Sequence, residues 1–173
     1  MSKKVIRFGL NTKDIDRAIK ELEQYKRDFQ MKVETYRKRI AEEIAGSASL
    51  NFGSAVIDDR VRGGPRKPEV KVRVDDRGNI AVVVADGEDA VWCEFGAGVY
   101  HNGSVGSSPH PKGAELGFTI GNYGCGFGRR KVWGYYDNGT LVLTHGTPAS
   151  MPMYNAAQEV MKKAIEIARE VWK

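Results

Sequence analysis

The side chains that can do chemistry in this 173-residue chain are few and widely separated. Its cysteines are Cys93 and Cys125, and its histidines are His101, His110 and His145. A cysteine nucleophile needs a histidine nearby in space, not in sequence, so a small hydrolase using Cys125 and a histidine stays open as an alternative. The apolar run around Cys93 instead predicts a buried, reduced thiol. No C-x-x-C or H-E-x-x-H spacing occurs, so we expect neither a metal nor another cofactor.

The glycine-rich stretch "GNYGCGFGRR", residues 121–130, does not match a phosphate-binding loop. It lacks the Gly-Lys-Ser/Thr of a Walker loop and the G-x-G-x-x-G of a dinucleotide site, and "KVWGYY" after it reads as a strand. Its aromatic residues alternate with Arg129, Arg130 and Lys131, a composition that can stack single-stranded nucleic acid. A nucleic-acid-binding module is therefore the alternative function. We favour the ordinary core face of a strand together with a partner-binding edge. The net charge of +5 gathers in segments 1–10 and 46–73 and not on one helix face, which is weak evidence for a phosphate-binding surface.

Glu94 stands out among the acids. It lies between Trp92, Cys93 and Phe95, directly before Gly96. Three readings are open: the carboxylate caps a turn, it pairs with an arginine of a neighbouring chain, or it is the exposed residue of a short helix.

A long helix is predicted over residues 11–45. Asn11-Thr12 offers an N-cap, and Gly46 a natural end. At 1.5 Å per residue such a helix is roughly 50 Å long, so it must overhang a small core, and its surplus face must be solvated or pack on another chain. A lysine, Lys26, interrupts its apolar seam. The seam follows steps of three and four: Ile15, Ile19, Leu22, Phe29, Val33, Tyr36, Ile40 and Ile44.

The middle of the chain reads as hairpins and loops. Segment 46–69 has turn formers and no period, which predicts an assembly loop or mobile arm. Alternation of Val70, Val72 and Val74 predicts a hairpin whose second strand is the more central, and residues 90–95 favour a short helix over a third strand. A long loop over 97–130 and a second hairpin follow. Asn138-Gly139 marks the turn of that second hairpin.

The last segment predicts a helix over 152–172 behind a stiff elbow. Pro152 fits the first helical position, and Pro148 holds the residue before it extended. The many alanines of this helix imply close approach to a sheet. We therefore expect one domain over 1–173 with an α+β fold. Its curved antiparallel sheet spans 70–145, and the long first helix and the last helix pack on it.

Two short motifs resemble a known family. "VWCEFGAG", residues 91–98, resembles the E-[FY]-G-[TS/A]-G signature of neck or tail-completion proteins of long-tailed bacteriophages, also described as head–tail joining or minor tail proteins. That family continues with a variable loop and a G-x-x-x-x-P-[FM] elbow before an alanine-rich helix. Here Thr147-Pro148 and Pro152-Met153 stand in the elbow. The departures are Ala97, where threonine or serine is commoner, and a longer 101–130 loop.

The resemblance implies a phage or prophage structural protein that is not an enzyme. It would form a ring, sixfold in this expectation, between the connector or head-completion proteins and the tail terminator or tail tube. It would lie in the neck of the virion, near the DNA channel, after passing through the host cytoplasm. The absence of a run of about 18 apolar residues predicts no membrane span. The expected assembly residues are Glu94, Phe95, Gly96, Arg60, Arg62, Arg66, Lys67, Thr147, Pro148, Pro152 and Met153. The four basic ones would meet an acidic neighbour or the DNA channel.

Overall fold

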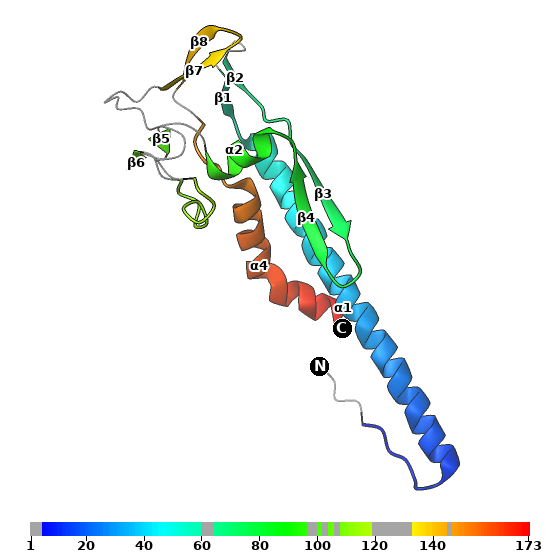
Figure 1. The fold of residues 1–173 in the computed structure, drawn as a ribbon. Coiled ribbons are helices and arrows are strands. Elements are labelled where there is room, and N and C mark those ends of the chain that lie inside the picture. The colour runs from blue at the N-terminus through cyan, green and yellow to red at the C-terminus, as the bar shows by residue number, and fades with distance from the viewer. Residues whose placement is uncertain are drawn as a thin grey trace.

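The computed structural model describes residues 5–59, 64–96, 100–101, 104–105, 108–118, 133–144 and 147–173. The chain has an α+β fold built on a long N-terminal helix, a C-terminal helix and short antiparallel strand pairs (Figure 1). The helices are α1 (Thr12–Ser54), α2 (Asp89–Phe95) and α4 (Pro152–Val171). The bounds of α2 and α4 and the start of α1 lie within one residue of the sequence-based prediction.

Helix α1 is longer than its sequence predicts. It begins as expected at Asn11, whose Oδ1 accepts a 2.9 Å hydrogen bond from the Asp14 N–H. The predicted end at Gly46 is wrong, because the helix continues to Ser54. A glycine inside a helix costs about 1 kcal/mol. Burial of the last turns offsets that cost, since Phe52 belongs to the core cluster with Ala55, Ile57, Ala90 and Cys93.

Gly46→Ala is therefore expected to stabilise the protein. A Cβ at this position meets no atom within 4 Å, and alanine loses less backbone freedom than glycine when the helix forms. We expect the free energy of unfolding to rise by about 0.5–1 kcal/mol, measured by thermal or urea unfolding. A fall in stability would show that α1 is not a continuous helix through residue 46.

The strands form separate two-stranded antiparallel pairs among the described residues, not one continuous sheet. Strand β3 (Lys71–Asp76) pairs with β4 (Ala81–Asp86), which confirms the first hairpin. Val72 and Val74 are half-buried while Lys71 and Arg73 are exposed, as the alternation predicts. Within the described part of the chain β4 pairs only with β3, so the prediction that it is the more central strand is wrong.

Three further strand pairs complete the described part. β7 (Trp133–Asp137) and β8 (Thr140–Thr144) turn at Asn138 and Gly139, with φ of 46° and 81°, as the Asn-Gly signal predicts. β1 (Ile57–Asp59) pairs with β2 (Gly64–Arg66), so segment 46–69, expected to be a loop, contains a helix end and a hairpin. β5 (Tyr100–His101) and β6 (Ser104–Val105) form a short pair inside the predicted 97–130 loop.

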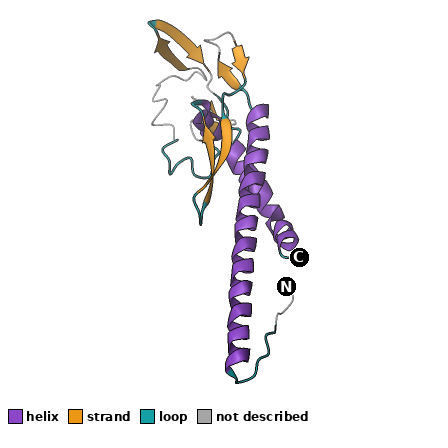
Figure 2. Cartoon of the chain, turned by 90° about the vertical axis from the view of Figure 1, so that its right-hand side faces the viewer, coloured by secondary structure: helices purple, strands orange, loops and turns teal. Residues whose placement is uncertain are grey.

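Helix α1 is the centre of the fold. Strands β3 and β4 pack along it, and α4 runs antiparallel beside its C-terminal half (Figures 1 and 2). Polar contacts fix this pairing: the Tyr36 hydroxyl donates to the Ala164 carbonyl at 3.3 Å, and Ser47 Oγ donates to Glu159 at 3.1 Å. The alanine-rich face of α4 is buried or half-buried, as predicted. The expected partner of this face, a sheet, is wrong, because the face packs mainly on α1, where buried Ala41 and Ala48 also permit close approach.

The N-terminal half of α1 extends beyond α4 and the strands, and residues 5–11 turn back from its start toward the end of α4 (Figure 1). Trp172, directly after α4, lies against Phe29 and Tyr36 of α1, with ring centroids 6.4 and 5.5 Å apart. Helix α1 continues from Phe29 back to Thr12. The overhang expected from the length of the helix is thus present.

Candidate assembly site

Helix α2 is short, but both of its ends are anchored by buried carboxylates. At its start, Asp89 forms a two-pronged ion pair with Arg66, with N–O distances of 2.6 and 2.8 Å. The same carboxylate accepts a 2.8 Å hydrogen bond from the Glu69 N–H. Asp89 is buried, and paired Arg–carboxylate bonds of this kind are strong and directional. They hold the segment after β2 against the first turn of α2.

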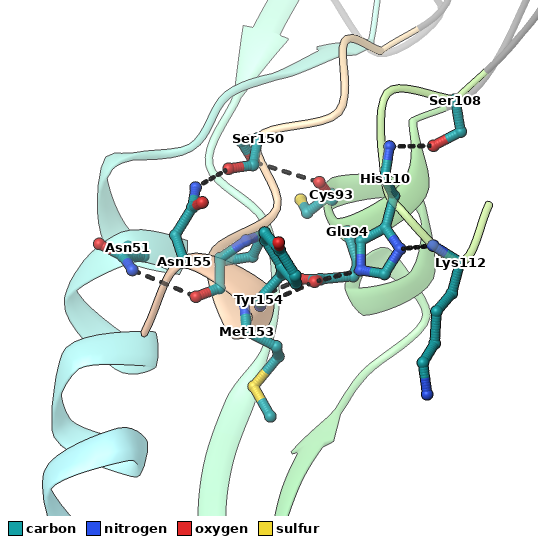
Figure 3. A network of polar contacts seen from close by, with 11 residues as sticks. Asn51, Cys93, Glu94, Ser108, His110, Lys112, Ser150, Met153, Tyr154 and Asn155 are labelled. Carbon is teal, nitrogen blue, oxygen red and sulfur yellow. Dashed lines mark hydrogen bonds and ion pairs between the residues drawn. The ribbon is translucent and has the colours of Figure 1, made fainter. Parts of the chain in front are cut away.

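At the other end of α2, Glu94 caps α4. Its two carboxylate oxygens accept hydrogen bonds from the N–H groups of Met153 and Tyr154, at 2.8 and 2.9 Å (Figure 3). The first N–H groups of a helix have no partner within the helix and attract negative charge. The N-cap residue of α4, Met151, is left-handed with φ 51° and makes no side-chain cap bond. Glu94 therefore supplies the cap from 59 and 60 residues away. Of the three interpretations of Glu94, the cap of a local turn comes nearest, but the carboxylate caps a distant helix. The interpretation as an exposed helix residue is wrong, because Glu94 is buried.

The backbone of α2 also accepts hydrogen bonds from the elbow. The carbonyl of Cys93 accepts hydrogen bonds from the N–H of Ser150 at 2.9 Å and from that of Met151 at 3.2 Å. Asn51, near the end of α1, donates to the Pro152 carbonyl at 3.1 Å. Pro152 occupies the start of α4, as predicted, and its side chain is fully buried. Three helices thus meet at the elbow.

His110 completes the network (Figure 3). Its Nδ1 accepts a 3.1 Å hydrogen bond from the Lys112 N–H, so in the neutral imidazole the proton sits on Nε2, which lies 3.2 Å from Glu94 Oε1. Its ring packs against Phe95 at 4.5 Å and Tyr154 at 5.3 Å between centroids. Both ring nitrogens and both carboxylate oxygens are engaged. The arrangement holds the 108–118 segment against α2 and α4.

Gly96 ends α2 in a conformation that side chains avoid. Its φ is 79° and its ψ 165°, and its N–H donates to the Trp92 carbonyl at 2.8 Å. Non-glycine residues held in this region cost about 1–3 kcal/mol. The glycine lets the chain leave α2 sharply after Phe95, whose ring stacks on Phe118 at 4.3 Å. Glu94, Phe95 and Gly96 each have a distinct structural task.

The Cys93 thiol is poorly suited to nucleophilic chemistry. Burial raises its pKa to about 11, and the nearby Asp89 carboxylate adds to the effect. Only thiolates attack electrophiles. In a Cys125→Ser variant we expect Cys93 to stay unlabelled by a neutral-pH thiol reagent until the protein is unfolded. Its thiolate population is about a hundredfold lower than at an ordinary pKa. Rapid labelling of the native variant would contradict this account of the thiol.

The other predicted assembly residues divide into three groups. Arg60 and Arg62 lie outside the described residues. Arg66 is held by Asp89 of its own chain, and Lys67 Nζ lies 3.4 Å from the Ala55 carbonyl at the end of α1. Arg66 and Lys67, which were expected to meet a neighbouring chain or DNA, therefore bond to groups of their own chain. In the elbow Thr147 is buried and Pro148 is exposed. Met153 packs on the core cluster, as do residues of β3 and β4.

Sequence reasoning missed His110 and Asn51 as members of this site. A polar residue flanked by prolines, such as His110, was the one local signal. Among the described residues no group of three His, Cys, Asp or Glu side chains is placed to hold a metal ion. Nor does any described helix have the length and apolar character needed to cross a membrane. Comparisons with protein-family models, curated proteins and solved structures find no match to this chain.

Proposed function

We propose that this chain is a structural subunit of a phage or prophage neck, acting without catalysis to complete the joint between head and tail. The observation that carries the proposal is the pair of hydrogen bonds from Met153 and Tyr154 to Glu94. They join in one site the two motifs on which the resemblance depends. Two motifs have a physical reason to occur together in one chain when a residue of one caps the helix that the other begins.

The distribution of chemistry also supports a subunit role. The buried carboxylates Asp89 and Glu94 are fully used in holding segments together. The thiol of Cys93 is disfavoured as a nucleophile by its raised pKa. The long overhang of α1 is an extended surface of the kind that oligomers use. Under this proposal the subunits form a ring, sixfold in our hypothesis, between connector and tail.

Complementation with purified protein tests the proposal. A lysate from a phage lacking this gene should gain infectious particles when wild-type protein is added. Gly96→Val and Pro152→Leu proteins should keep nearly normal helix content by circular dichroism, yet restore at least about tenfold fewer particles, because each moves the α2–α4 joint. Gly78→Ala, in the turn between β3 and β4, is the control and should complement. Full complementation by both variants would show that the α2–α4 joint is not needed for assembly.

A further inference from the structure

The N-terminal half of α1 carries a stripe of large apolar side chains that stay largely exposed within the described chain, although the small Ala18 between them is buried. Ile15, Ile19, Leu22 and Phe29 are between 39 and 56 % exposed. Their spacing places them at alternating a and d positions of a heptad, with Ile19 at a and the others at d. A helix face that stays in water does not need a heptad repeat of large apolar residues, since polar residues are enough to keep it solvated.

Further along α1, the same stripe already forms a helix–helix interface. Its next d residue, Tyr36, bonds to the Ala164 carbonyl of antiparallel α4. That interface ends at Trp172, against Phe29. Toward the start of α1 the stripe continues as Ile15, Ile19 and Leu22, which α4 does not reach and which stay largely exposed. The end of α4 also borders an open apolar groove lined by Ile165, Ala168, Arg169, Trp172 and Lys173. The exposed stripe is therefore a direct continuation of an existing antiparallel helix pairing.

The charges of this segment favour a self-complementary partner. Residues 12–29 carry five basic and five acidic side chains, a net charge of zero. A surface of this kind neither attracts a phosphate backbone nor repels a copy of itself. The one charged residue in the seam is Lys26, at an a position. A polar residue at an a position selects one register and pairing at a cost in stability.

We propose that the segment Thr12–Phe29 of α1 pairs antiparallel with the same segment of a second copy of this chain. If the second copy ran parallel, the part of its α1 that follows residue 29 would lie in the space that α4 of the first copy occupies. An antiparallel partner begins where α4 ends. In that arrangement Lys26 faces a d residue of the second copy and lies beside the acid that follows it, Asp16 after Ile15 or Glu23 after Leu22.

This contact does not depend on the proposed neck role. An antiparallel pair is a two-fold, isologous contact, whereas a ring is closed by head-to-tail contacts between different surfaces. Complementation that failed while the pairing was observed would overturn the neck role alone. Complementation that succeeded with a strictly monomeric protein would overturn the pairing alone.

Sedimentation velocity of the full-length protein over a concentration series tests the pairing. We expect a concentration-dependent dimer. Leu22→Glu should weaken dimerisation by about tenfold or more, because it places a charge in the seam. Gln24→Glu introduces the same side chain on the opposite face of α1 and should leave the dimer unchanged. A protein that stays monomeric to sub-millimolar concentration, or equal effects of the two variants, would overturn the proposal.

Two further variants test the details of the seam. Lys26→Ile should tighten the dimer by about tenfold, since it removes a charge from the interface; no change would show that position 26 does not face a partner. In a Cys125→Ser background, Ile15→Cys should form no disulfide-linked dimer under mild oxidation, because antiparallel pairing separates the two copies of residue 15. Efficient cross-linking would overturn the antiparallel orientation.

Discussion

Glu94→Gln is expected to lower the free energy of unfolding by about 3 kcal/mol, because it removes a buried charge that accepts bonds from two helix N–H groups and faces His110. Glutamine offers one oxygen and one NH₂ group. Its NH₂ would have to face a Met153, Tyr154 or His110 donor. Two donors facing one another leave both without a partner.

Urea unfolding measures this loss, with Glu115→Gln as the matched control. Glu115 is an exposed acid in the described 108–118 segment, and its replacement should change stability by no more than about 0.5 kcal/mol. Amide hydrogen exchange locates the effect: the Met153 and Tyr154 amides should exchange faster in Glu94→Gln than in the wild type, more than amides in the middle of α1. An unfolding free energy equal to that of the control variant would show that Glu94 is not the cap.

Gly87→Ala should be at least as damaging, with an expected loss of about 3 kcal/mol or more. Gly87 has φ 141°, and a Cβ built on it would overlap the carbonyl oxygen of Glu69. That backbone cannot move freely, because the Glu69 N–H is bonded to Asp89, which also holds Arg66. The added methyl group therefore strains the residue and forces apart the anchor at the start of α2.

Gly78→Ala separates these two causes. Gly78 also has a positive φ, 74°, but a Cβ there meets no atom within 4 Å. It should show backbone strain alone, about 1–2 kcal/mol. Thermal unfolding of the two variants side by side gives the comparison. If Gly87→Ala were no less stable than Gly78→Ala, the close approach of Gly87 to Glu69 would not matter energetically.

The elements that local signals specify were predictable from the sequence. Helix α4 has Pro152 at its first position and an apolar face of regular spacing, and the β7–β8 turn has Asn138-Gly139. Both signals act within a few residues, so they depend little on the rest of the fold. The end of α1 was not predictable, because burial of Phe52 in a core made by distant segments carries the helix past Gly46.

The candidate site was predictable in its members but not in its geometry. Glu94 and the elbow were both singled out, yet the bonds between them span 59 and 60 residues, and no periodicity reports such a contact. One signal was available. The residues before α4 include Ser150 and Met151, and the N-cap Met151 has no side-chain oxygen to cap the helix. A helix start without a local cap predicts a cap from elsewhere, and a lone acid in an apolar run was the candidate.

Electron microscopy of particles made without this chain tests the central proposal most directly. We expect filled heads and finished tails to lie separate in the lysate, and joined particles to form when the wild-type gene is supplied in trans. Heads and tails that join at the wild-type frequency without the chain would contradict a role in the neck.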